Sequence, residues 1–302
     1  MKRTAPQTVA PLSVSRLTKR YGSSRGIENV TFEVRAGEVF GFLGPNGAGK
    51  TTTIRSILGF LTPSDGLISL SGSPPSTDTR RDIGYLSGDF SAYEHLTGQS
   101  FLNYLGSLSR TVNWEYVTEL ARRLDASLNR PIHTLSKGNK QKIGIIQAMM
   151  HQPKLLILDE PTSGLDPLIK QEFYTLLDEA RTKHGTTVFV SSHDLSEVQK
   201  ICDRAGFIRD GKLIGVEAIA NISHLSARRF VVTLDSKPNN TLLAKLKTLS
   251  KLTVNDHSLA CTVTGNIREF LSAVSLLDVS DFHEQSLSLE ELFMHYYQKG
   301  DA

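Results

Sequence analysis

The chain has 302 residues, a formal net charge of +3 and a sequence pI near 8.8, and its only cysteines are Cys202 and Cys261. The length predicts one large domain and a smaller one. The sequence has no apolar run of about 18 residues and no signal-peptide pattern, which predicts a soluble, intracellular protein that does not span a membrane by itself. The cysteines lack the spacing of a zinc site. The net charge is only weakly basic, and the sequence has no basic stripe interleaved with aromatic residues, so it gives no reason to expect nucleic-acid binding.

The first predicted elements lead to a glycine-rich loop. Residues 1–11 are expected to form a flexible extension, and a turn is expected at 21–24. Short strands are predicted over 12–17, 27–34 and 38–43. The last of these strands runs into the sequence GPNGAGKT at 44–51, and an amphipathic helix is predicted over 52–58. The loop therefore joins the end of a buried strand to the start of a helix.

This loop matches the phosphate-binding pattern G-x-x-x-x-G-K-[ST]. Its glycines allow backbone N–H groups to turn inward, and these donors together with the positive end of the helix attract phosphate oxygens. Lys50 is expected to reach the β- and γ-phosphates, and Thr51 to place its hydroxyl on Mg²⁺. The residues expected to bind the nucleotide are Gly44, Asn46, Gly47, Gly49, Lys50, Thr51 and Thr52. The sequence thus predicts that the chain binds a nucleoside triphosphate with Mg²⁺.

The middle of the chain alternates between strands and helices. Strands are predicted over 66–70, 83–86, 155–158 and 187–191, and helices over 167–183 and from 194 onwards. Between about 89 and 150 the pattern is helical, and Leu105 and Leu108 are among the residues spaced for one helix face. Asp194 and Glu197 are predicted to form a capping box. The alternation predicts an α/β fold with a parallel sheet, to which a helical subdomain is added.

The apolar strand over 155–158 is followed directly by Asp159 and Glu160. A continuous apolar run is typical of a strand buried on both faces of a parallel sheet, whose carboxyl end carries the chemistry. A phosphate-loop enzyme needs one carboxylate for Mg²⁺ and another to orient or deprotonate the attacking water. We assign Asp159 to the metal and Glu160 to the water.

The character of the sequence changes after residue 225. Strands are predicted over 230–234, 252–254, 259–263 and 279–282, and helices over 241–249, 267–276 and from 288 onwards. The order βαββαβ before the last helix predicts a small ferredoxin-like α+β domain. We therefore divide the chain into the extension 1–11, a nucleotide-binding domain over 12–225 with its helical subdomain at about 89–150, and a C-terminal domain over 226–302.

Five segments of the chain resemble, in this order, the motifs of an ATP-binding cassette (ABC) ATPase. They are residues 44–51, LSKGN at 135–139, residues 155–160, SGLD at 163–166 and His193. The resemblance covers residues 12–217 and implies a phosphate-loop cassette fold and the hydrolysis of ATP. In the family two cassettes enclose two ATP molecules, and each ATP is held by the phosphate loop of one subunit and the signature motif of the other.

The resemblance also implies roles for single residues. Ser136 and Gly138 of the signature would contact the partner's γ-phosphate, and Asp166 would lie at the dimer seam. His193 would contact the γ-phosphate and help to hold the water, and Tyr21 would stack on the adenine. Ser136 can also be an ordinary helix N-cap, and the two roles are compatible. For Tyr21 the alternative is an aromatic side chain packed at a strand end.

Two departures from the family pattern are visible. The signature reads LSKGN instead of the commoner LSGGQ, so Lys137 and Asn139 change the side chains beside the γ-phosphate while the two contacting residues survive. Gly88 stands where the family usually has a glutamine that senses Mg²⁺ and the membrane subunit. Its neighbour Asp89 is the candidate for a substitute metal ligand.

Residues 84–105, the signature lysine and LEELF at 289–293 resemble bacterial drug, antibiotic-peptide and lipid-type exporter cassettes that have a separate membrane subunit. This implies two partners, a second cassette and an integral membrane subunit at the inner face of the cell membrane. The membrane subunit's coupling helix would enter a groove between the sheet and residues 89–125. The alternative is a soluble cassette ATPase of translation or DNA repair, whose relatives usually carry two cassettes or a long insertion. A third reading is a regulatory module whose C-terminal domain senses a ligand.

Overall fold

The computed structural model describes residues 9–22, 24–90, 93–108, 112–224, 228–236, 250–255, 257–263 and 267–285, and also Leu243 and Leu246. The chain divides into two compact units, Met1–Ile219 and Ala220–Ala302, which are described separately. The predicted domain boundary after residue 225 stays a prediction, because compactness alone does not show that either unit folds by itself. Three predicted segments lie wholly or mostly outside the described residues: the extension 1–11, the helix over 241–249 and the last helix from Ser288.

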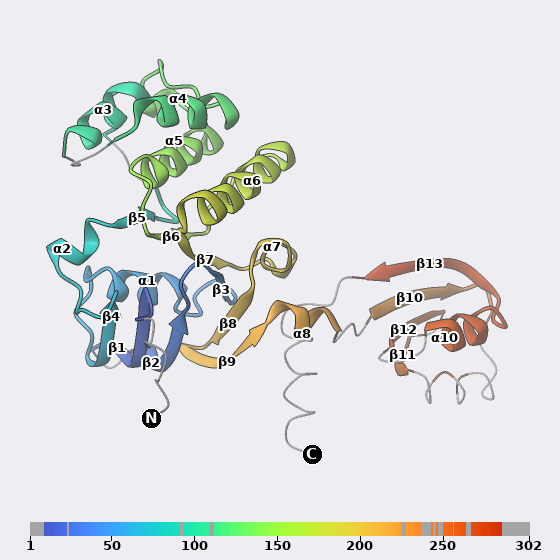
Figure 1. Ribbon diagram of the computed structural model, residues 1–302. Helices are drawn as coiled ribbons and strands as arrows, with labels where there is room; N and C mark the ends of the chain where they lie inside the picture. The colour runs from blue at the N-terminus through green and yellow to red at the C-terminus, as the bar shows by residue number, and fades with distance from the viewer. Residues whose placement is uncertain are drawn as a thin grey trace, which may run out of the picture. The chain divides into compact units, whose positions relative to one another are not determined.

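A six-stranded sheet forms the centre of the first unit, with the order β5-β6-β7-β3-β8-β9 (Figure 1). Its strands are β3 (Val39–Leu43), β5 (Ile83–Leu86), β6 (Leu155–Asp159), β7 (Thr187–Ser192), β8 (Arg204–Arg209) and β9 (Lys212–Ala218). All neighbours are parallel except β9, which is antiparallel to β8. Every residue of β3, β6 and β7 is buried, as expected for the middle of a parallel sheet. The carboxyl ends of these three neighbouring strands therefore meet at one edge.

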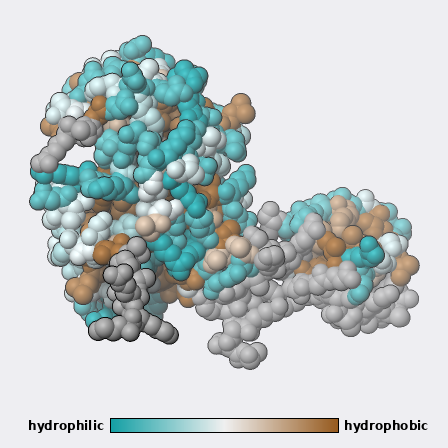
Figure 2. All heavy atoms as spheres, in the orientation of Figure 1, coloured by the Kyte–Doolittle hydropathy of each residue, from teal (hydrophilic) through white to brown (hydrophobic). Residues whose placement is uncertain are grey.

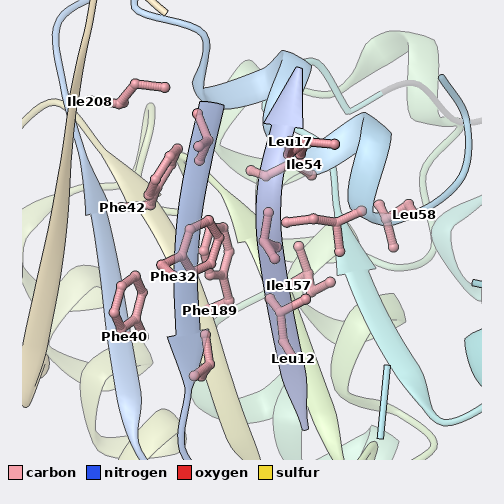
Figure 3. Packing of buried hydrophobic residues seen from close by; sticks show 14 of the residues in the cluster. Leu12, Leu17, Phe32, Phe40, Phe42, Ile54, Leu58, Ile157, Phe189 and Ile208 are labelled. Atoms are coloured by element: carbon pink, nitrogen blue, oxygen red, sulfur yellow. The ribbon is translucent and has the colours of Figure 1, made fainter. Parts of the chain in front are cut away.

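A three-stranded antiparallel sheet, with the order β2-β1-β4, faces the central sheet across a hydrophobic core. Its strands are β1 (Leu12–Tyr21), β2 (Ser24–Val34) and β4 (Asp65–Leu70), so the first two are longer than predicted. The ring of Phe32 stacks on those of Phe40 and Phe189, at centroid distances of 5.4 and 5.6 Å (Figure 3). Helix α1 (Lys50–Ile57) adds Ile54 and Ile57 to the same core. This packing anchors α1, which the glycine-rich loop precedes, to the core between the two sheets.

The remaining helices of the first unit include the predicted helical subdomain. They are α2 (Thr77–Arg80), α3 (Gly98–Leu108), α4 (Trp114–Arg123), the 3-10 turn η1 (Ile132–Thr134), α5 (Lys137–Met149), α6 (Pro167–His184) and α7 (Leu195–Ile201), and α8 (Ile219–His224) begins at the last residue of the unit. In α4, Val117 and Leu120 are buried. The face predicted for α3 is wrong at its end, since Leu108 is 68% exposed at the C-terminus of the helix.

The contact between β5 and α5 depends on the small size of Gly84. An added Cβ would lie 2.0 Å from the Ala148 carbonyl oxygen and 2.7 Å from Leu156 Cδ1. Because the first of these atoms belongs to the backbone, we expect Gly84→Ala to lower the free energy of unfolding by about 3 kcal/mol. Urea denaturation measures this. In the matched control Gly185→Ala the Cβ has no neighbour within 4 Å, and its positive φ costs only about 1 kcal/mol. Equal losses in the two variants would contradict the prediction.

The second unit contains a four-stranded antiparallel sheet with the order β11-β12-β10-β13. Its elements are β10 (Arg228–Leu234), β11 (Ser250–Asn255), β12 (Ser258–Val263), α10 (Ile267–Val274) and β13 (Val279–Gln285). Strand β11 pairs with β12, and Asn255 lies opposite Ser258. Phe230 and Phe270 stack in its core at 5.3 Å. The ferredoxin-like arrangement stays a prediction, because the first of its two helices lies mostly outside the described residues.

No helix in the described ranges combines the length and the apolar character that crossing a membrane requires. On the face of the first unit that Figure 2 shows, hydrophilic residues predominate and hydrophobic ones are scattered. This agrees with the sequence, in which no long apolar run was found.

Candidate functional site

The glycine-rich loop leads from β3 into α1 at the edge where the three buried strands end. Gly44 packs so closely that a Cβ would lie 2.2 Å from the Ile208 carbonyl oxygen, and Gly49, the N-cap of α1, has a φ of +106°. No acidic residue lies in the first turn of α1, so nothing there cancels the positive end of the helix. The loop therefore presents backbone donors and a positive helix end at the same place, which suits an anion such as phosphate.

The ammonium group of Lys50 lies inside this loop. It donates to the carbonyl oxygens of Gly44 at 2.8 Å and of Pro45 at 3.1 Å, and it lies 3.2 Å from Glu160 Oε1. Only 6% of the side chain is exposed, so this charge is held in place. The structure thus connects the loop after β3 directly to the turn after β6.

The carboxylate of Asp159 is buried at the end of β6 and is hydrogen-bonded on both oxygens. It accepts from Thr51 Oγ1 at 2.8 Å on Oδ2 and from Ser191 Oγ on Oδ1. The two residues predicted to share Mg²⁺, Thr51 and Asp159, are therefore adjacent. Oxygen ligands of this kind are those that Mg²⁺ prefers, and the residues present fit such an ion. Ser191 was missed, although a hydroxyl at the end of an apolar strand was a visible signal.

Glu160 stands between Lys50 and His193. Its Oε2 lies 3.0 Å from His193 Nδ1, and its Oε1 faces the Lys50 ammonium. The φ of Glu160 is +49°, which is strained for a non-glycine residue and is common at functional sites. Its amide N–H donates to Ser191 at the end of β7, and this bond helps to hold the turn. The three predicted residues are thus brought together by three neighbouring strands.

The signature segment starts α5 and touches the SGLD segment of the same chain. Ser136 is the N-cap of α5, and its Oγ accepts from the amide and the Nδ2 of Asn139, each at 3.3 Å. The hydroxyl proton of Ser136 is therefore free to donate elsewhere. Lys137 Nζ donates to Ser163 Oγ at 3.0 Å. A Cβ on Gly138 would lie 2.5 Å from the carbonyl oxygen of Gly164, so only glycine fits there without rearrangement.

The other predicted site residues lie at the end of β1, in the glycine-rich loop, in α1 and at the start of α6. Tyr21 is half exposed at the end of β1, and its ring lies against Gly26, a residue that also approaches Gly49 of the loop. Asp166 is the N-cap of α6 and accepts from the amides of Leu168 and Ile169. The predicted nucleotide-binding residues Asn46 and Thr52 are, respectively, exposed in the loop and half-buried in α1.

The residue that lies against Asp159 from the turn after β5 is Gly88. A Cβ there would be 3.4 Å from Asp159 Cγ. That Gly88 fills the place of the family's glutamine stays a prediction. Asp89 is exposed, and its carbonyl oxygen accepts from Ser87 Oγ at 3.0 Å. A role of Asp89 as a metal ligand stays a prediction.

Comparison with known proteins identifies the family of the chain. A profile of the ABC transporter family matches residues 27–163. The uncharacterised ABC transporter ATP-binding protein YhcH of Bacillus subtilis is 32% identical over 290 residues, which cover 94% of each chain. This chain belongs to the ABC transporter family.

Two further relatives place the cassette within the family. The bacitracin transport ATP-binding protein BcrA of Bacillus licheniformis is 36% identical over 203 residues, 66% of each chain. A solved ATP-binding subunit of an ABC transporter is 32% identical, with a TM-score of 0.65 over 70% of this chain and 91% of that chain. The α/β cassette fold is thereby confirmed, and the cassette is an ATPase that serves as the ATP-binding subunit of a transporter. The alternative of a soluble ATPase in translation or DNA repair is not favoured.

Several polar contacts in the cassette were not predicted from the sequence. Asp194 caps α7 as predicted, but its amide donates to Ser192 Oγ, so the capping box with Glu197 is wrong. The Glu197 carboxylate is occupied elsewhere, with Thr162 and Lys170 among its donors. Gln141 of α5 was missed as well, and its amide donates to the carbonyl oxygen of Pro161 at 2.9 Å. Local spacing along the chain contains no signal for contacts between such distant segments.

Proposed function

We propose that the cassette binds MgATP through its phosphate loop and hydrolyses it with Glu160 as the group that orients or deprotonates the attacking water. The observation that carries the proposal is the line of contacts from Lys50 through Glu160 to His193, at 3.2 and 3.0 Å. Lys50 would stabilise the β- and γ-phosphates, and His193 would contact the γ-phosphate. Thr51 and Asp159 would hold Mg²⁺, with Asp89 as a further candidate ligand. Mg²⁺ would supply charge neutralisation of the phosphates.

A second cassette completes each ATP site in this proposal. Members of the family dimerise and work with membrane subunits. Ser136 and Gly138 would meet the partner's γ-phosphate, and the exposure of Ser136 supports this. Asp166 would lie at the seam, and Tyr21 would stack on the adenine of its own site. ATP binding would close the dimer, and hydrolysis would reopen it.

The transport partner would be a separate integral membrane subunit at the inner face of the cell membrane, and the direction of transport would be export of a drug, peptide or lipid. The likeness to BcrA supports this class of cargo. A pocket of about 470 Å³ between the sheet and the helical subdomain supports a docking place for the membrane subunit's coupling helix. Its lining residues are Tyr85, Ser87, Phe90, Tyr93, Phe101, Leu105 and Gln147.

The test of the membrane partner is copurification. A tagged chain carrying Glu160→Gln would be expressed in its native host, the membranes solubilised in mild detergent with MgATP, and the captured proteins identified by mass spectrometry. We expect a multi-helix membrane protein in near-equal amount. In a parallel preparation of Lys50→Ala, we expect the captured complex to contain less ATP. Ribosomes or nucleic acid in place of a membrane protein would overturn the transport assignment.

A further inference from the structure

Glu197, in the first turn of α7, joins three segments that surround the proposed catalytic residues. Its two carboxylate oxygens accept from Thr162 Oγ1, each at 2.8 Å, and Oε1 accepts from Lys170 Nζ at 2.7 Å. Its Oε2 also accepts from Ser192 Oγ at 3.2 Å. The donors come from the turn after β6, from α6 and from the end of β7. One carboxylate thus holds together segments that are far apart in the sequence.

Two of these donors are direct neighbours of the reacting machinery. Thr162 follows Glu160 by two positions in the same turn, and Ser192 directly precedes His193. Both donors are buried. The Ser192 hydroxyl oxygen also accepts from the Asp194 amide at 2.9 Å, which fixes the backbone on the far side of His193. The turns that carry Glu160 and His193, whose side chains lie 3.0 Å apart, are therefore both hydrogen-bonded to Glu197.

The surroundings of Glu197 hold its carboxylate in place. Its side chain is 13% exposed, and Lys170 compensates its charge at close range. Burial raises the pKa of the Tyr174 phenol, and the nearby carboxylates of Glu197 and Asp194 raise it further, so Tyr174 stays a protonated donor beside them. Charge-assisted hydrogen bonds from several directions hold a carboxylate more rigidly than single neutral bonds do. Such support suits the strained backbone of Glu160, which surrounding contacts must maintain.

We propose that Glu197 is a positioning residue for ATP hydrolysis, which aligns Glu160 with His193 through Thr162 and Ser192. This inference rests on the proposed function of Glu160 and His193. Glu197 itself touches neither residue in these contacts, and its effect is on geometry alone. Loss of its carboxylate would leave nucleotide binding by the phosphate loop intact and would disturb the alignment of the water-orienting group.

The test compares Glu197→Ala with the parent in steady-state ATP hydrolysis by the purified full-length chain. We expect kcat to fall by about 10- to 100-fold while KM for ATP changes by less than about threefold, because a misplacement near 1 Å costs this much in rate. In MgATP the variant should also accumulate as an ATP-bound dimer on a sizing column. Glu197→Gln keeps the shape and one acceptor oxygen, so it should restore most of the rate.

The matched control is Glu38→Gln, at the other end of the central sheet. Glu38 is likewise a buried carboxylate, paired with Arg204 at 3.1 Å, and it lies at the start of β3. We expect this variant to lose thermal stability without losing kcat. A Glu197→Ala protein that keeps the parental kcat, or that loses rate only in proportion to its loss of thermal stability, would overturn the proposal.

A double-mutant cycle tests the route through the two hydroxyls. Thr162→Val and Ser192→Ala each remove one donor, and both should lower kcat. Added to Glu197→Ala, either should lower it little further, because the interaction is already lost. Fully additive effects would overturn the proposal. An inactive parent chain with saturating MgATP would overturn the proposed hydrolysis itself and this inference with it, whereas an active parent with unaffected Glu197 variants would overturn the inference alone.

Discussion

Glu160→Gln is expected to lower the kcat of ATP hydrolysis by about 100- to 10,000-fold while ATP still binds. The amide has the shape of the carboxylate but cannot take a proton from water, and it removes the negative charge that faces Lys50 at 3.2 Å and would face the γ-phosphate. Because hydrolysis is what reopens the dimer, the variant should remain a dimer with ATP bound. Size-exclusion chromatography in MgATP, with nucleotide analysis of the dimer peak, measures this.

Glu38→Gln again provides the control for this experiment, since it makes the same chemical change far from the site. It should hydrolyse ATP at the parental rate and return to the monomer as ATP is consumed. The column is run both with the chain alone and with the complete transporter. A Glu160→Gln protein that stays monomeric in saturating MgATP, alone and in the complex, would count against the sandwich mechanism.

Lys50→Ala should abolish measurable ATP binding, with a rise in Kd of about 100-fold or more, because charge-assisted hydrogen bonds to the phosphates are lost. The loop itself should survive, since its backbone is fixed by Gly44 against Ile208 and by the start of α1. Calorimetric titration with ATP and Mg²⁺ measures the affinity, and circular dichroism confirms the fold.

A second buried lysine shows whether the loss is specific to the loop. Lys142 of α5 is also buried and donates to the Asp125 carbonyl oxygen at 3.0 Å, so Lys142→Ala removes a similar charge outside the proposed phosphate site. It should bind ATP like the parent. If Lys50→Ala bound ATP with parental affinity, the assignment of residues 44–51 to the phosphates would be wrong.

The sequence alone determined the family and most of the element order in the first unit, and it predicted the main site residues. Strands β8 and β9 were not predicted. The physical reason is that these signals are local. The glycine-rich loop has to follow a strand and open a helix, and a strand buried on both faces has to be continuously apolar, as β6 is before Asp159 and Glu160. The cap of α7 by Asp194 follows from the same short-range rules.

The tertiary structure alone decided which distant side chains meet. The strand order β6-β7-β3 brings Ser191 to Asp159 and His193 to Glu160, although long stretches of sequence separate these residues. The same order gives Glu197 partners that its spacing from Asp194 did not suggest, because a buried carboxylate takes the strongest donors within reach. Hydrophobic periodicity sets the elements, but the polar contacts that align the site depend on how those elements pack.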